Sequence, residues 1–296
     1  MSTVRVERSR ARDRLGIGVK TRERRTSTSP LGTVALADMA PAAIGPTRGR
    51  DLLVLCYHAV SSNWPELVAI EPAKLQAQVE RLLRRGWTPT TFTEAMVAPP
   101  GRKTLAVTFD DAFLSTVRLA APVLDRLGVP ATIFVPTAFP DSGRPLSWPH
   151  LDRWLNTPYE PELESASWAG LTSLREAGWE IGSHTVSHPR LTELGAADLD
   201  SELRDSKAEI ERHVGERCRS IAYPYGDVDD RVARAAQACG YEAGAALLPG
   251  RHSHDRLRFP RVFIPSREPD VLHRLHLRRT VRRLQSSAIW PGAQGS

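Results

Sequence analysis

The sequence predicts one α/β domain, an irregular (β/α) barrel spanning residues 51–268. From residue 51 onward, short β-type runs alternate with helical runs, and no internal repeat interrupts the series. In addition, the most unusual polar residues directly follow several different expected strands. A barrel delivers the ends of all its strands to one rim, so this placement favours a barrel over an open sheet.

Seven short β-type runs are the expected strands, and they lie at 52–57, 104–109, 131–135, 179–182, 219–223, 241–246 and 261–264. Helical periodicity predicts helices at 72–85, 113–127, 168–177, 196–214, 228–239 and 269–284. In the first of these, Leu75, Val79 and Leu82 share one face, and Gly86 ends the helix. The last one belongs to a basic C-terminal helix and tail, expected over residues 269–296.

The composition is that of an ordinary globular protein, with 41% hydrophobic and 25% charged residues in a chain of 296. The longest relevant apolar run, 52–57, is far shorter than the roughly 20 residues of a membrane-spanning helix, so no transmembrane segment is expected. The net charge of +6 comes from the two ends of the chain rather than from the expected domain. Nucleic acid is therefore not an expected partner, because phosphate binding needs basic groups clustered on a folded face. No motif supports peripheral membrane contact through the basic ends.

Residues 1–50 are expected to form a disordered basic tail. Arg24 and Arg25 precede the apolar stretch 31–37, an order that superficially resembles a twin-arginine export signal. The stretch is short and is followed by Asp38, so a solvated tail and a cytoplasmic location are the favoured interpretation.

The three cysteines, Cys56, Cys218 and Cys239, are far apart and odd in number. They form neither a disulfide framework nor a CxxC metal motif. Buried or free thiols in a reducing compartment are expected.

Two adjacent carboxylates, Asp110 and Asp111, end the apolar strand expected at 104–109. Neighbouring side chains of a strand point to opposite faces, so both can serve one site only where the backbone turns. The alternative is a simple N-cap for the following helix, a position where aspartate is favoured.

Two histidines, His184 and His188, follow the strand expected at 179–182. On a helical turn, a spacing of four residues brings both imidazoles to one face, within reach of one ion. Two histidines and one carboxylate occur both in open zinc sites and in non-haem iron oxygenases. The spare carboxylate favours a hydrolase, because hydrolysis needs a base beside the metal-bound water.

Three motifs resemble those of the polysaccharide deacetylase family (carbohydrate esterase family 4, NodB homology domain). They are TFDD at 108–111, EIGSHTVSHPRL at 180–191 and AYPYG at 222–226. The resemblance covers residues 51–265 and implies a distorted (β/α) barrel, expected to have seven strands. It also implies a divalent metal, usually zinc, and removal of acetyl groups from sugars. The LCYH segment at 55–58 resembles the N-terminal element of the exopolysaccharide N-deacetylase branch.

The resemblance also implies a role for each matching residue. Asp111, His184 and His188 match the metal ligands, and Asp110 matches the catalytic base. His58 matches the general acid of the exopolysaccharide branch. The backbone N–H of Tyr225 is then expected to hold the oxyanion, while His252, His254, His273 and His276 are expected to be surface residues.

The chain departs from the family pattern at two positions. Ala112 stands where the family has glycine, which is tolerated if the residue has a negative φ. Ala222 stands where the third motif often has an arginine that orients the base. Arg261 is a candidate replacement, and a structural salt bridge is the alternative. Trp148, Tyr225 and Arg261 are the expected substrate contacts, with core packing as the alternative for the aromatic pair.

The expected reaction is the metal-dependent removal of N-acetyl groups from amino sugars in a glycan or glycoconjugate, with release of acetate. The expected cofactor is Zn²⁺ and the expected partner is an N-acetylated carbohydrate. Two alternatives remain: hydrolysis of other C–N bonds, such as formamides or cyclic amides, and a catalytically silent carbohydrate-binding relic. The sequence does not determine the oligomeric state.

Overall fold

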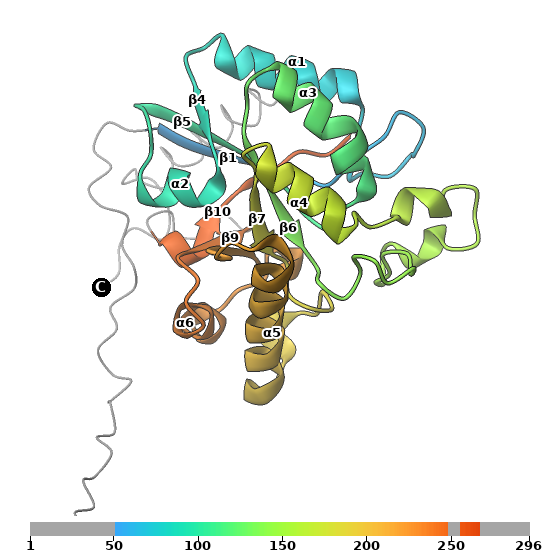
Figure 1. Cartoon of the computed structure of the whole chain (residues 1–296), viewed down its shortest axis with the longest axis vertical. Coiled ribbons are helices and arrows are strands. Elements are labelled where there is room, and N and C mark those ends of the chain that lie inside the picture. Colours follow the sequence, from blue (N-terminus) through green and yellow to red (C-terminus); the bar gives the residue numbers. More distant parts are fainter. Residues whose placement is uncertain (1–50, 248–254, 267–296) are drawn as a thin grey trace, which may run out of the picture. The chain divides into compact units, whose positions relative to one another are not determined.

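The computed structural model describes residues 51–247 and 255–266, and the statements below concern this part of the chain (Figure 1). The expected tail at 1–50 and the expected helix and tail at 269–296 lie outside the described residues.

A parallel sheet forms the centre of the described domain (Figure 1). Its strands are β1 (Asp51–Tyr57), β4 (Thr88–Thr90), β5 (Lys103–Phe109), β6 (Ala131–Val135), β7 (Glu180–Ser183), β8 (Ser220–Ala222), β9 (Ala243–Ala246), β10 (Phe259–Pro260) and β11 (Val262–Phe263). The strand order is β10-β9-β8-β7-β6-β5-β1-β11, and β4 pairs with β5 outside this path. A small second sheet joins β2 (Ala59–Val60) to β3 (Ala69–Ile70). Each of the seven expected strands is present.

The two ends of the strand path meet through one short segment. β10 pairs with β9, β11 pairs with β1, and only Arg261 separates β10 from β11. The Arg261 amide donates to the carbonyl of Ala246 at 2.8 Å, and the Ile264 amide donates to the carbonyl of Cys56 at 3.0 Å. The sheet is therefore nearly closed into a barrel, as the sequence predicts. The described path has eight strands rather than seven, because Arg261 separates the last stretch of strand into β10 and β11.

The described α-helices are α1 (Pro72–Leu83), α2 (Phe92–Val97), α3 (Ala121–Arg126), α4 (Trp168–Glu176), α5 (Ala196–Val214) and α6 (Asp230–Ala238). The expected bounds are identical for α5 and within two residues at each end for α1, α4 and α6. The helix expected at 113–127 is instead a π-helical turn, Thr116–Ala120, followed by α3. Pro122 lacks an amide hydrogen, so a regular α-helical hydrogen-bond ladder cannot run through it. Among the described residues, no helix combines the length and apolar character needed to cross a bilayer.

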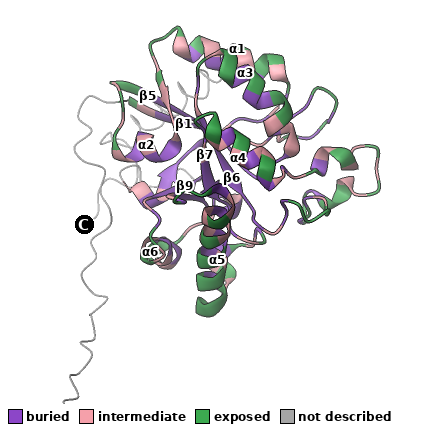
Figure 2. Cartoon of the chain, viewed as in Figure 1, coloured by how far each residue is buried: buried purple, intermediate pink, exposed green. Residues whose placement is uncertain are grey.

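Alternate strand residues pack on opposite faces of the sheet, so a hydrophobic core lies on each face. Leu55 and Val107 belong to the outer core beneath the surrounding helices, whereas Val54, Ala106 and Phe134 belong to an inner core. Figure 2 shows the buried strands at the centre and the exposed residues on the outer sides of the helices. Side chains of α2 complete the inner core. The barrel interior is thus packed with side chains and is not an open channel.

The sequence does not predict β4 or α2. β4 has only three residues, and one of them is Pro89, which cannot donate to a sheet hydrogen bond. α2 has six residues, too few for a helical period to be recognised. Both elements are therefore set by packing against β5 and the inner core.

Candidate active site

The candidate site lies at the carboxyl ends of three strands of the barrel, two of which, β1 and β5, are adjacent. His58 follows β1, Asp110 and Asp111 follow β5, and His184 and His188 follow β7. Both carboxylates and the two later histidines are buried, and the His58 side chain is only 13% exposed. The structure brings together all five residues that the sequence predicts for metal binding and proton transfer.

Asp111, His184 and His188 form a compact triad. The Nε2 atoms of His184 and His188 lie 3.3 and 3.5 Å from Oδ1 of Asp111. No hydrogen bond satisfies this buried oxygen within the described residues. Burial lowers the pKa of His188 to about 3, so its imidazole is neutral and can act as a ligand. One carboxylate and two imidazoles are the ligand set of an open zinc site, so the residues fit the divalent metal that the sequence predicts.

The neighbouring groups orient the triad as a metal site requires. His184 Nδ1 lies 2.8 Å from the carbonyl of Ala222, a contact that leaves Nε2 available for a ligand bond. Burial alone would lower the pKa of His184, but the carboxylates of Asp111 and Asp110 raise it overall. For Asp111, burial favours a higher pKa, and the surrounding histidines outweigh it and lower the pKa. The triad therefore holds an ionised carboxylate in a nearly dry environment.

The two histidines do not share a helical turn, so this part of the sequence argument is wrong. Thr185 and His188 have φ values of 70° and 64°, and the loop between the histidines bends sharply. Glu202 of α5 accepts hydrogen bonds from the amides of Val186 and Ser187, which fixes the bend. Glu202 was not predicted as a supporting residue, because nothing local distinguishes it from other acidic residues of an exposed helix.

Asp110 is bound from inside the barrel by Arg261. The guanidinium makes two bonds, of 2.6 and 2.7 Å, to the two carboxylate oxygens, and Arg261 is fully buried. Burial would raise the pKa of Asp110, but Arg261 outweighs it and holds the pKa far below its usual range. Arg261 therefore holds the expected base through a buried salt bridge, which supports its candidacy as the replacement for the arginine that the third motif lacks. A fully buried Arg261 cannot contact substrate, which corrects its expected role as a substrate contact.

Cys56 also contacts Asp110, with its thiol 3.4 Å from Oδ2. Cys56, His58 and Asp110 form a second group of side chains close enough to share an ion. Both oxygens of Asp110 already accept bonds from Arg261, and a cation there would face this positive charge at short range. We therefore assign the candidate metal site to the Asp111 triad.

His58 stands beside Asp110 and is the more exposed of the two. Its Nε2 lies 4.0 Å from Oδ2 of Asp110, and its ring packs edge-on against Phe263. Burial lowers the pKa of His58, against the raising effect of Asp111 and Asp110. The imidazole is therefore neutral before reaction, and it must first receive a proton to act as an acid.

Strained backbone concentrates at this site. Asp111, Ala112, Thr185, His188 and Tyr225 account for five of the seven non-glycine residues with positive φ in the described chain. The sequence argument expected alanine to be tolerated at position 112 if its φ is negative. In the structure the φ of Ala112 is 51°, so this condition is not met. Such conformations are costly for residues with a Cβ, and they persist where surrounding contacts enforce them. Their clustering supports the identification of this rim as the functional site.

Aromatic side chains cover the triad, but not as the sequence predicts. The Trp148 ring stacks on His188 with centroids 4.0 Å apart, and only 5% of Trp148 is exposed. It therefore offers almost no surface to a sugar, which corrects its expected role as a stacking platform. Tyr225 is partly exposed, with His188 at 4.8 Å and the guanidinium of Arg190 over its ring at 4.2 Å. The other histidines considered from the sequence, His252, His254, His273 and His276, lie outside the described residues.

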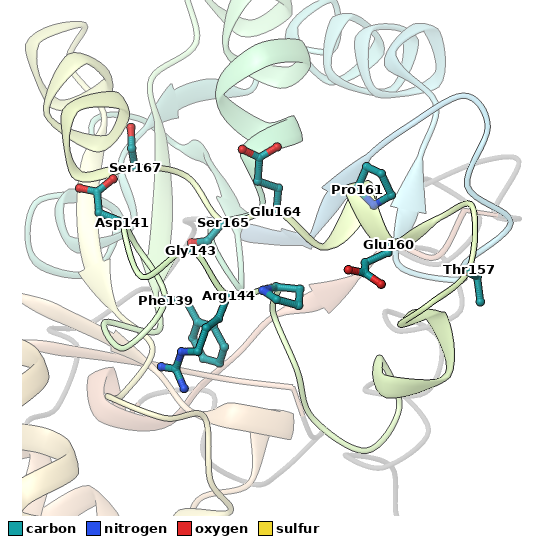
Figure 3. A pocket seen from close by; sticks show the side chains of 11 residues that line it. Phe139, Asp141, Gly143, Arg144, Thr157, Glu160, Pro161, Glu164, Ser165 and Ser167 are labelled. Atoms are coloured by element: carbon teal, nitrogen blue, oxygen red, sulfur yellow. The ribbon is translucent and has the colours of Figure 1, made fainter.

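A separate hollow of about 770 Å³ lies between the loop after β6 and the segment before α4 (Figure 3). Figure 3 shows Asp141 and Ser167 on one side of it and Glu160, Pro161 and Thr157 on the other. None of its lining residues belongs to the triad, and no histidine lines it. The chemistry therefore belongs to the barrel rim and not to this hollow.

A barrel rim carrying a buried Asp-His-His triad and a second carboxylate defines a hydrolase with a candidate metal site. A family model described as polysaccharide deacetylase matches residues 98–244, which include all three motifs. The chain belongs to the polysaccharide deacetylase family, a family of deacetylase hydrolases. His58 and Arg261 lie outside the matched segment, so the structure carries the argument for both.

The chain is also similar to individual proteins of known sequence or structure. The chain is 27% identical over 224 residues to YxkH of Bacillus subtilis (strain 168), whose name places it among the polysaccharide deacetylases; the match covers 74% of this chain and 72% of YxkH. A polysaccharide deacetylase from Bacillus cereus superposes with a TM-score of 0.61 at 23% identity, covering 77% of this chain and 68% of the other. IcaB from Ammonifex degensii superposes with a TM-score of 0.59 at 23% sequence identity, and the match covers 77% of this chain and 97% of IcaB. The deacetylase PplD from Streptococcus pyogenes superposes with a TM-score of 0.59 at 20% sequence identity, and the match covers 77% of this chain and 95% of PplD. These structures show that the fold is shared.

Proposed function

We propose that this protein is a metal-dependent deacetylase that removes N-acetyl groups from amino sugars of a glycan or glycoconjugate and releases acetate. The observation that carries the proposal is the geometry around Asp111. Three ligand atoms converge in a buried triad, and a second carboxylate, held at both oxygens by Arg261, lies next to it. Ligands and base are thus separate groups, as hydrolysis of an amide requires.

We assign the metal to Asp111, His184 and His188, with Zn²⁺ as the expected ion. When bound, the ion would polarise the acetyl carbonyl and lower the pKa of a coordinated water. Asp110 then accepts a proton from the attacking water, and Arg261 fixes the direction of its oxygens. The backbone N–H of Tyr225 is the expected donor to the carbonyl oxygen as negative charge develops there.

His58 completes the proton transfer in this proposal. An amine leaving group must be protonated, and His58 is neutral before reaction because of its burial. Asp110 takes up the proton from the attacking water, and its Oδ2 lies 4.0 Å from Nε2 of His58. A small movement of the imidazole closes this distance, so His58 can pick up that proton and deliver it to the departing nitrogen. Asp110 and His58 therefore act in sequence on one proton.

The proposal is tested by measuring acetate release from an N-acetylglucosamine oligomer, with and without a chelator, followed by addition of Zn²⁺. Activity should disappear with the chelator and return with the metal. His184→Ala should lose bound metal in elemental analysis, because one of three ligands is removed. The matched variant Asp110→Asn should keep the metal and lose about 10²–10⁴-fold in turnover, as expected for loss of a general base. Full metal content in His184→Ala, or near-normal turnover in Asp110→Asn, would contradict the assigned roles.

A further inference from the structure

The side-chain ring of His188, a member of the triad, belongs to a cluster of four rings, each of which contacts two others. The successive centroid distances are 4.0 Å from Trp148 to His188, 4.8 Å from His188 to Tyr225, 6.3 Å from Tyr225 to His150 and 6.2 Å from His150 back to Trp148. His188 is buried, whereas His150, at the opposite corner, is exposed. The arrangement therefore leads from a candidate metal ligand to the solvent, and His150 stands at its outer end.

One hydrogen bond fixes the orientation of His150. Nε1 of Trp148 donates to Nε2 of His150 at 3.2 Å. An indole N–H can only donate, so Nε2 is the acceptor and the ring proton of His150 is on Nδ1. Nδ1 makes no hydrogen bond within the described residues, and the side chain is exposed. A buried tryptophan thus holds an exposed imidazole so that a free N–H donor is available beside the site.

We propose that His150 determines substrate specificity by donating its Nδ1–H to a hydroxyl or ether oxygen of the sugar whose acetamido group is at the triad. This inference rests on the proposed function and adds to it a residue that recognises the sugar through a hydrogen bond. A sugar bound by its acetamido group must extend outward from the triad, and the ring arrangement leads outward to His150. Oriented polar groups at the edge of a site commonly provide such specificity.

Arg190, an exposed cation near these rings, is less suited to this role. Arg190 lies over Tyr225, and its guanidinium approaches Asp227 at 3.7 Å and Glu193 at 4.0 Å. Its charge is therefore partly satisfied within the protein. Within the part of the chain that the structure describes, the Nδ1 donor of His150 has no such partner.

The test compares His150→Phe, which keeps a ring but removes the donor, with His150→Gln, which retains an amide donor and an acceptor. The substrates are an N-acetylglucosamine oligomer and 4-nitrophenyl acetate, an ester with no sugar. We expect His150→Phe to raise KM for the oligomer about tenfold, the value of one hydrogen bond, with kcat and the rate on the ester unchanged. His150→Gln should restore most of the loss. His213→Phe is the matched control, because His213 also stacks on a tryptophan, Trp168, but belongs to α5.

An unchanged KM for the oligomer in His150→Phe, or an equal loss on the ester, would overturn the inference. Calorimetric titration of each variant with the oligomer separates this result from failure of the proposed function. If the wild-type protein binds the oligomer but releases no acetate, the proposed function fails, and weaker binding by His150→Phe still supports the role of His150. A wild-type protein that binds no oligomer would overturn both.

Discussion

Ala112 shows how a single side chain can be held in a conformation that it disfavours. It follows Asp111 directly, and both residues have positive φ. Ala112 is fully buried, and its carbonyl accepts a hydrogen bond of 2.8 Å from the amide of Ala166. The turn that brings Asp110 and Asp111 to one site thus requires backbone angles that suit glycine.

We expect Ala112→Gly to stabilise the protein by about 0.5–1 kcal/mol, because glycine adopts a positive φ without the steric cost of a Cβ. The measurement is the free energy of unfolding from urea titration. Ala169→Gly is the control, since Ala169 is an exposed residue of α4 and its replacement should cost about 1 kcal/mol. A destabilised Ala112→Gly would mean that the methyl group contributes more packing energy than its strain costs.

Arg261 is the residue whose contribution is clearest from geometry. Lysine keeps a positive charge but cannot bind both oxygens of Asp110 at once. Arg261→Lys should therefore lower kcat by about tenfold or more through misplacement of the base, with little change in KM. Steady-state kinetics on the N-acetyl oligomer measure this split. A loss confined to KM would instead place Arg261 in substrate binding, against its burial.

At the scale of elements, the closing strand of the barrel depends on close approach of backbone segments. Gly244 of β9 faces the buried hydrogen bond of 2.8 Å from the hydroxyl of Tyr223 to the carbonyl of Leu257. A Cβ at position 244 would overlap both groups. The residues just before β10 can therefore lie against β9 only because position 244 has no side chain.

We expect Gly244→Ala to destabilise the protein by about 1–3 kcal/mol, as overpacking of a rigid interior does. Because the same displacement would move Arg261, acetate release should fall in parallel. Thermal unfolding and activity assays check the two effects. Gly170→Ala is the control, since the nearest neighbour of its added Cβ lies at an ordinary 3.4 Å and alanine favours the helix. Equal stability of the two variants would show that β9 can shift to make room.

For the whole molecule, the buried Asp110–Arg261 pair makes stability depend on pH. The pKa of Asp110 in the folded protein is far below its ordinary value of about 4. A depressed pKa stabilises the fold above the unfolded-state pKa, and this contribution is lost as the pH falls through the range below about 4.

The free energy of unfolding should therefore fall as the pH is lowered below about 4, and the fall should be less steep in Asp110→Asn, which cannot titrate at this position. Urea titrations at a series of pH values measure the slope, with a chelator present so that metal release does not contribute. Asp205→Asn, at an exposed position on α5, is the control. Identical slopes for Asp110→Asn and the wild type would show that the pair adds nothing to acid sensitivity.

The features that depend on local patterns can be predicted from the amino-acid sequence alone. Periodicity and glycine stops located α5 and the main strands, because helices and buried strands impose regular spacing on their apolar residues. Polar residues directly after strands indicated the rim, since parallel strands deliver their ends to one side of a barrel. His58, Asp110, Asp111, His184 and His188 were identified in this way, and all five lie together in the structure.

The groups that support those five residues become known only from the folded chain. Arg261 reaches Asp110 across 151 positions of the chain, and His150 is held beside the site by a tryptophan that packs on His188. The positive φ of Ala112 and the burial of Trp148 likewise follow from contacts with segments distant in sequence. A local pattern carries no information on these contacts, because they depend on which side chains the closed barrel brings within a few ångströms of one another.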